Sequence, residues 1–266
     1  MKTTSSIRNP AIAFTLLELL TVIAIIGILA AIAVPTLHTF QPNPLAVTGR
    51  QLLDDIGRAR QLAISQRTTV FMVFVPPAFW NNPAYATLPP TEKVKADKLW
   101  DKQYIGYNFV SLRGVGEQPG VSNPRYWSSW RTLPKGAIIA PEKFGPRNTI
   151  NYKFYTNNAT GIPVLIYNIP GFSTNAVPFP SEFVNPAQYA LLPSIGFNSF
   201  GQLISQTNEV IPIIKGTVMV PRAQPSGLPT NNAAATIAQT AAGNVTNVVV
   251  IDWLTGRARI EKQELR

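Results

Sequence analysis

The sequence contains no cysteine and a single histidine in 266 residues. The lack of cysteine excludes disulfides, thiol nucleophiles and thiolate metal sites. General acid–base catalysis needs titratable groups that converge, and His38 lies at the end of a long apolar segment where no general base would face a substrate. No Ser-His-Asp set, metal cluster or phosphate-binding loop can be assembled from the other residues. We therefore expect a protein that is not an enzyme and that binds no metal or cofactor.

Acidic residues are also scarce, because 13 Asp and Glu stand against 23 Lys and Arg, for a formal net charge of +10. A basic chain favours anionic partners such as nucleic acid or a phospholipid surface, although solubility alone would explain the charge. Asp54 and Asp55 are neighbours on an expected helix and point about 100° apart, so they do not form an acid/base pair.

Charge is almost absent from residues 14–37, an apolar run with one carboxylate, Glu18. A lone charge in hydrocarbon costs at least about 2.5–3.5 kcal/mol, which makes Glu18 a functional candidate whose partner is expected to be an amine. If the chain is cut before Phe14, its new α-amino group lies about one helical turn from Glu18, and a neighbouring copy can bring the same group. This arrangement indicates assembly chemistry.

The apolar run is longer than the 7–15 residues typical of a secretory signal peptide, and it carries an acid. Residues 19–37 are long enough to span most of a bilayer, with a small shortfall that tilt or thinning can absorb. Lys2 and Arg8 precede the run, and basic residues stay on the cytoplasmic side. An ordinary secretory signal peptide and a plain signal anchor both fit this run less well, and the residues after it are expected to lie outside the cytoplasm.

The motif Phe14-Thr-Leu-Leu-Glu18, followed by an apolar helix with Pro35, resembles the class III (prepilin-type) signal of type IV pilins and pseudopilins. The resemblance implies that a prepilin peptidase removes leader 1–13 between Ala13 and Phe14 and methylates Phe14. It also implies that residues 14–40 form a transmembrane and filament-core helix, with Glu18 as the assembly acid. Ala13 replaces the glycine usual in the family, but it is also small, so we expect processing.

A second helix is expected at residues 45–66, after the interruption by Pro42 and Pro44, so that residues 41–67 form a hinge and an amphipathic helix. Apolar residues recur there at spacings of three and four, which predicts an apolar stripe packed on a sheet. The stripe consists of Leu52, Leu53, Ile56, Ala59, Ala63 and Ile64.

Strand patterns separated by Pro, Gly and Asn clusters follow, and they predict an all-β head over residues 68–266 with a long insertion at 76–147. The expected strands are 69–75, 104–112, 137–140, 149–155, 164–169, 195–205, 210–220 and 245–260. Residues 233–242 are expected to be a short helix or a surface loop. The predicted class is α+β, with a long N-terminal helix and an antiparallel β-rich head, and the resemblance implies the pilin-like fold.

Three segments resemble the GspH/FimT branch of minor pseudopilins and minor pilins: residues 52–71, 195–204 and 248–260. This resemblance implies a subunit of a type II secretion pseudopilus or a type IV pilus. Its partners would be the prepilin peptidase, other pilin or pseudopilin subunits, the inner membrane and the assembly platform within that membrane. The head would lie in the periplasm or, in a filament, on the cell surface.

Arg257 and Arg259 follow Gly256, which suits a hairpin turn, and the strand period places both side chains on one face about 7 Å apart. That spacing matches successive phosphates of a nucleic acid. In FimT-type minor pilins a Gly-Arg-x-Arg motif at this place is implicated in DNA capture, so a DNA-binding minor pilin is one alternative. Two arginines on an edge strand are also ordinary edge protection.

A second alternative is a lineage-specific pseudopilin whose enlarged head is adhesive. The densest aromatic group of the insertion contains Trp127 and Trp130, next to Arg125 and Arg131. These rings could stack on bases or sugars, or they could cover an edge of the core.

Overall fold

The computed structural model describes residues 15–39, 43–77, 79–117, 123–147, 150–156, 163–219, 236–239 and 247–262. The predicted leader, the predicted cleavage site at Ala13 and Phe14, and residues 41 and 42 of the predicted hinge lie outside the described residues. The chain divides into two compact units, Met1–Pro42 and Asn43–Arg266, which are described separately.

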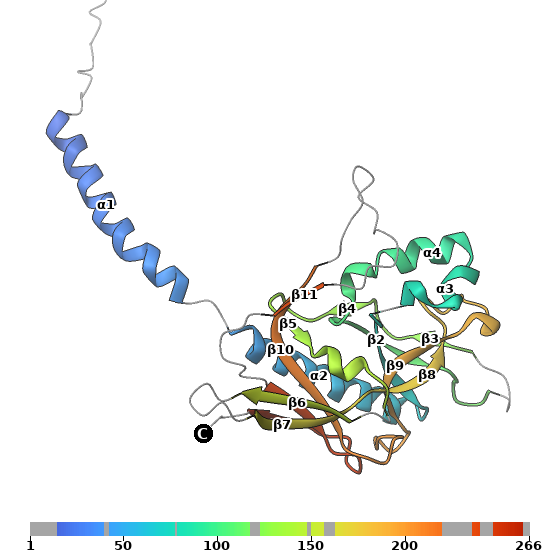
Figure 1. Ribbon diagram of the computed structural model, residues 1–266. Helices are drawn as coiled ribbons and strands as arrows, with labels where there is room; N and C mark the ends of the chain where they lie inside the picture. Colours follow the sequence, from blue (N-terminus) through green and yellow to red (C-terminus); the bar gives the residue numbers. More distant parts are fainter. Residues whose placement is uncertain are drawn as a thin grey trace, which may run out of the picture. The chain divides into compact units, whose positions relative to one another are not determined.

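The first unit contains helix α1 (Leu16–Thr39), shown in Figure 1. Glu18 N donates to Thr15 Oγ1 at 3.3 Å, which is half of a Ser/Thr-x-x-Glu capping box at the helix start. The large apolar side chains between Leu16 and Leu29 are 47–82% exposed, so they have no core of their own to enter. Within the part of the chain that the structure describes, no helix is long and apolar enough to cross a membrane.

The second unit begins with helix α2 (Pro44–Ser65), which confirms the predicted amphipathic helix. Asn43 caps it, since its Oδ1 accepts a hydrogen bond from Leu45 N at 3.1 Å, and Pro44 suits the first turn because its missing N–H is not needed there. The buried stripe of α2 packs on the sheets of the head; it consists of Leu45, Thr48, Gly49, Leu52, Asp55, Ile56, Ala59 and Ala63.

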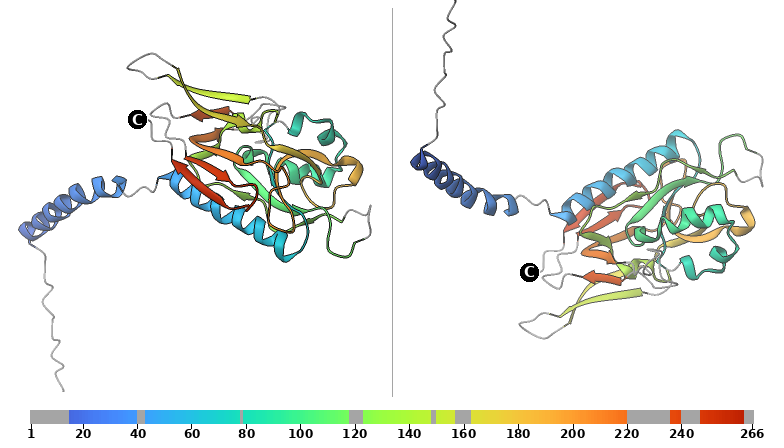
Figure 2. Two further views of the ribbon diagram at one scale, coloured as in Figure 1. Left: turned by 90° about the horizontal axis from the view of Figure 1, so that it is seen from below. Right: turned by 90° about the horizontal axis from the view of Figure 1, so that it is seen from above.

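The head contains two antiparallel sheets and a separate hairpin, with α2 along one side (Figures 1 and 2). The first sheet has the order β3-β2-β1-β9-β8, with β4 also paired to β2. Its strands are β1 (Val70–Phe74), β2 (Gly106–Ser111), β3 (Arg125–Tyr126), β4 (Arg131–Thr132), β8 (Ser173–Val177) and β9 (Ala190–Phe197).

The second sheet has the order β11-β10-β12-β13, with β5 also paired to β10. Its strands are β5 (Ala137–Ile139), β10 (Glu209–Met219), β11 (Thr236–Gln239), β12 (Asn247–Ile251) and β13 (Ala258–Lys262). The hairpin pairs β6 (Ile150–Thr156) with β7 (Pro163–Pro170).

Strand β1 lies between two apolar cores, which explains why its sequence is continuously apolar rather than alternating. Val70, Met72 and Phe74 enter the core beneath α2. Phe71 and Val73 point the other way, into a second core. The prediction of a buried strand at this place is confirmed.

The insertion at 76–147 builds much of that second core, and the prediction of an all-β head is wrong there. It forms the short helices α3 (Pro83–Thr87) and α4 (Pro90–Asp97), on the side of the head away from α2 (Figure 2). It also supplies three 3-10 turns, at Phe79–Asn81, Trp100–Lys102 and Pro141–Phe144. Asn82 caps α3 by accepting from Ala84 N at 3.0 Å, a local signal that the strand pattern did not use. Trp80 and Trp100 pack with ring centroids 4.4 Å apart.

The aromatic group of the insertion covers the core, as one of its two interpretations predicted. Trp127 packs against the core beneath α2, and its Nε1 donates to Ser111 Oγ at 3.1 Å. Trp130 packs against the second core, and its Nε1 donates to Pro180 O at 2.9 Å. Both indole N–H groups are thus already satisfied inside the head.

Three further predictions of secondary structure need correction. The strand expected at 195–205 is wrong beyond Phe197, because β9 ends there and a turn follows. Strand β8 (Ser173–Val177) was not predicted, because its polar residues give no apolar alternation. Strand β11 (Thr236–Gln239) forms where residues 233–242 were expected to be a helix or loop, because it pairs with Gly216–Met219 of β10. The other residues of 233–242 lie outside the described part of the chain.

The raised pKa values of tyrosines in the insertion lead us to expect that the head loses stability at alkaline pH. Burial, followed by the hydrogen bond to Asp97, raises the pKa of Tyr85 from 10.0 to about 12. Burial also raises the pKa of Tyr104 and of Tyr107. The pKa of each of these tyrosines is higher in the folded than in the unfolded protein. Their contribution to the free energy of unfolding is therefore complete below about pH 10 and is lost as the pH rises toward 12.

A pH titration of the full-length protein, followed by tyrosinate absorbance and circular dichroism, tests this expectation. We expect part of the tyrosine absorbance change to occur together with unfolding above about pH 10. The Tyr85→Phe variant should lose less stability between pH 10 and pH 12 than the wild type. Ionisation of all tyrosines near pH 10 in a protein that stays folded would contradict the prediction.

Candidate functional site

The predicted assembly acid, Glu18, lies in the first turn of α1, with an exposed side chain. Among the residues that the structure describes, no cation or side-chain donor approaches its carboxylate, whereas its backbone N–H is held by Thr15. The predicted cleavage-site residues, Ala13 and Phe14, lie outside the described residues. An exposed carboxylate can pair with an amine, and this role of Glu18 stays a prediction.

The second predicted site, the turn between β12 and β13, is closed by its own hydrogen bonds. Asp252 Oδ1 accepts from both Thr255 N and Thr255 Oγ1 at 2.8 Å, and these bonds lower the pKa of Asp252. Gly256 N donates to Asp252 O at 2.8 Å, and Gly256 has a φ of +62°, which favours glycine. The turn is therefore a defined structure and not a loose loop.

This turn packs against a second turn, at residues 198–203, and against the end of α2. Leu203 N donates to Trp253 O at 2.9 Å, and Arg60 Nε donates to Thr255 O at 2.8 Å. A Cβ added to Gly256 would lie 1.9 Å from Gly201 O, so the two backbones touch. Segments 52–71, 195–204 and 248–260, which carry the GspH/FimT resemblance, thus meet at one place in the head.

The two arginines of the turn differ in their surroundings. Both are exposed, while Ala258 and Ile260 pack against the core. Arg259 Nη2 lies 2.8 Å from Glu261 Oε1, which makes an exposed ion pair. Arg257 has no side-chain partner among the described residues. The sequence analysis missed this pair, although a Glu two residues along the same strand face was the available signal. DNA contact by these arginines stays a prediction.

A buried ionic group that the sequence analysis missed lies at the start of β10. Lys143 is fully buried and is ion-paired to Glu209, which Arg147 Nη1 also approaches at 3.2 Å from Oε2. Lys143 Nζ donates to Pro170 O at 2.8 Å, and burial lowers the pKa of Lys143. No sequence signal marks this group, because Lys143 lies in a short 3-10 turn and its partner Glu209 is 66 positions away.

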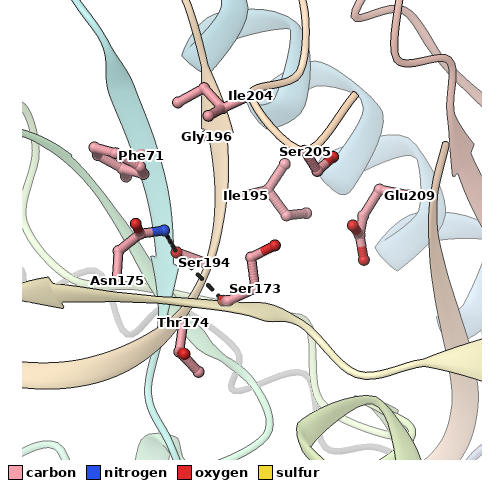
Figure 3. A pocket seen from close by; sticks show the side chains of 10 residues that line it. All are labelled: Phe71, Ser173, Thr174, Asn175, Ser194, Ile195, Gly196, Ile204, Ser205 and Glu209. Carbon is pink, nitrogen blue, oxygen red and sulfur yellow. Dashed lines mark hydrogen bonds between the residues drawn. The ribbon is translucent and has the colours of Figure 1, made fainter. Parts of the chain in front are cut away.

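Glu209 also borders a polar cavity of about 130 Å³ beside β8 and β9 (Figure 3). Ser173, Ser194 and Ser205 line it, and Asn175 Nδ2 donates to Ser194 Oγ at 2.8 Å. A water occupies about 30 Å³ of liquid, and ligand sites usually exceed about 300 Å³. The cavity therefore has room for a few waters and is smaller than most ligand sites.

A further missed group joins α2 to the first sheet. Asp55 is buried, accepts a hydrogen bond from Tyr107 OH and lies 3.3 Å from Arg131 Nη1. Gln51 Nε2 also approaches Tyr107 OH at 2.7 Å. Asp55 thus ties the helix to the sheet, while its neighbour Asp54 is exposed.

Comparison with known protein families gives one match: a model described as the prokaryotic N-terminal methylation motif covers residues 9–34. No curated protein and no solved structure matches the chain. The matched residues include Phe14 and Glu18 and end within α1. The motif implies processing by a prepilin peptidase and assembly with other pilin subunits, and it supports a signal of the type IV pilin-like kind at residues 9–34.

Proposed function

We propose that this protein is a minor pseudopilin or minor pilin of the GspH/FimT branch, assembled into a type II secretion pseudopilus or a type IV pilus. Cleavage between Ala13 and Phe14 and methylation of Phe14 produce the mature subunit. Residues 14–40 anchor it in the inner membrane before assembly, with the head outside the cytoplasm. The methylation motif at residues 9–34 is the observation that carries this proposal.

The first turn of α1 supports an assembly role. A helix that is apolar on all sides is buried by lipid or by other helices, and the apolar side chains from Leu16 to Leu29 are exposed in the chain by itself. Glu18 in such surroundings carries a desolvation cost that a neighbouring subunit's Phe14 amine would offset. The proposed filament contact therefore consists of apolar packing and one amine–carboxylate pair per interface.

The head supports the choice of branch. Arg60 of α2, Gly201 and Gly256 come from the three resembling segments and contact one another. This contact joins α2 to the turn at residues 198–203 and to the turn between β12 and β13. All three resembling segments therefore contribute to one packing contact. We assign the head a role in assembly and recognition and propose no catalysis.

Processing of the full-length protein tests the proposal. We expect membrane-extracted protein, made with a co-expressed prepilin peptidase, to begin at N-methylated Phe14, and protein made without the peptidase to keep residues 1–13. Intact mass and N-terminal sequencing measure both states. An Ala13→Gly variant, which restores the usual family residue, should be processed at least as completely.

The Glu18→Ala variant separates processing from assembly. We expect it to be cleaved normally and to be absent from sheared filaments, because the amine of the adjoining subunit loses its carboxylate. A chain that keeps its leader in the presence of the peptidase, or that is cut near Ala33, would contradict the proposed function. Normal incorporation of Glu18→Ala would contradict only the role of Glu18.

A further inference from the structure

Two neighbouring turns of the head each expose large apolar side chains. Phe200 is 80% exposed and Leu254 53%, and Ile204 and Trp253 are 44% and 36% exposed. The turns are joined by the hydrogen bond from Leu203 N to Trp253 O. Phe200, Trp253 and Leu254 are here called the turn patch, while Ile204 lies beside Gly196 and Phe71 at the cavity of Figure 3. Large apolar side chains exposed on neighbouring turns are a candidate interaction site.

The turn patch is held by a rigid frame. Asn198 Oδ1 accepts from Phe200 N at 3.0 Å and from Gln202 N at 2.9 Å, which fixes the first turn. Asp252 fixes the second turn, and Arg60 ties that turn to α2. A surface held in this way loses little conformational entropy when a partner binds.

The charge beside the turn patch is positive. Arg60 and Arg257 flank Gly256, and Arg257 has no side-chain partner among the described residues. The carboxylate of Asp252, whose pKa the hydrogen bonds from Thr255 lower, offsets one of these two charges, and Glu261 pairs with Arg259, which leaves one net positive charge. Charge complementarity therefore favours a partner that brings carboxylates.

Other occupants fit this surface less well. A second copy that met this surface with the same surface would bring the same arginines and repel the first. Nucleic acid needs several phosphate contacts, and only Arg257 of the predicted pair is unpaired.

We propose that the turn patch is the docking surface for a protein partner whose contacting segment carries apolar side chains flanked by Asp or Glu. Trp253 and Phe200 are the apolar anchors, and Arg257 selects the acidic flank, since aromatic and arginine residues dominate binding energy at interfaces. The inference goes beyond the proposed function, because it concerns the head and holds for a pilus and a secretion pseudopilus alike.

The test uses the full-length protein in cells that make its natural partners, with the photoreactive residue p-benzoylphenylalanine at position 200. Position 183 is the matched control, because Phe183 is 76% exposed and lies in another segment of the head. We expect a discrete protein adduct from position 200, absent from position 183, whose cross-linked peptide contains Asp or Glu beside the modified residue. The yield should fall by about tenfold or more in Arg257→Glu and stay unchanged in Lys135→Glu, a reversal at another exposed cation.

A charge exchange completes the design. Replacing the identified carboxylate of the partner by Arg should restore the adduct in the Arg257→Glu variant. The proposal is overturned if position 200 gives no adduct, an adduct with a second copy, an adduct removed by nuclease, or an adduct that ignores Arg257→Glu. The mass of the uncrosslinked chain shows separately whether cleavage before Phe14 occurred, and thermal unfolding confirms that each variant is folded.

Discussion

Replacing Glu209 by Ala lowers the free energy of unfolding of the head by about 3–5 kcal/mol, because it leaves the buried Lys143 without a counter-ion. Lys143 is fully buried and retains only the carbonyl of Pro170 and the ring of Phe172, 4.8 Å from its Nζ. Arg147 loses its partner too, but it is partly exposed and can turn to water. Denaturant unfolding of the full-length protein in detergent, followed by circular dichroism of the head, measures the change.

The control replaces both charges at once. A Lys143→Met/Glu209→Leu variant should lose less stability than Glu209→Ala, because an apolar pair of similar volume leaves no unpaired charge. The Lys143→Met change alone should be intermediate, since Glu209 keeps Arg147. If Glu209→Ala lost less than about 1 kcal/mol, well under the cost typical of breaking a buried pair, the ion pair would not stabilise the head.

Replacing Gly256 by Ala is expected to be the second large effect, at about 2–4 kcal/mol. The positive φ of +62° alone costs about 1 kcal/mol for a residue with a Cβ. The new Cβ would also lie 1.9 Å from Gly201 O, and relieving such overpacking costs about 1–3 kcal/mol more. The two turns must separate, so the hydrogen bond from Leu203 N to Trp253 O weakens.

Gly116 supplies the matched control for that substitution. Its φ is +85°, and a Cβ there meets nothing within 4 Å, so Gly116→Ala carries the conformational cost without the contact. Thermal unfolding of both variants isolates the contact between Gly256 and Gly201. Equal losses in the two variants would show that the turns are not packed as described, and the frame of the turn patch would then lack support.

Local patterns were enough to predict the elements whose environment repeats along the chain. The spacing of Leu52, Ile56, Ala59 and Ala63 predicted α2, because each of these residues meets the same core. The apolar run at β1 was recognised for the same reason, since both of its faces are buried. Strand β8 was not predicted, because its polar residues form a strand only by pairing with β9.

The candidate site was predicted only in part. The placement of Arg257 and Arg259 outside, with Ala258 and Ile260 inside, follows from a period of two that any strand has. The difference between the arginines depends on Glu261, whose distance from Arg259 is set by side-chain conformation.

By itself the sequence determined the N-terminal signal, because residues 9–34 are recognised as a contiguous string and need no fold around them. It also determined the amphipathic helix and most strands, which depend on neighbours a few positions away. Only the tertiary structure decided that Lys143 meets Glu209, 66 positions away, and that Arg60 meets Thr255, 195 positions away. Such contacts follow from chain topology and packing, which no local periodicity encodes. The turn patch depends on them, because they bring its two turns together.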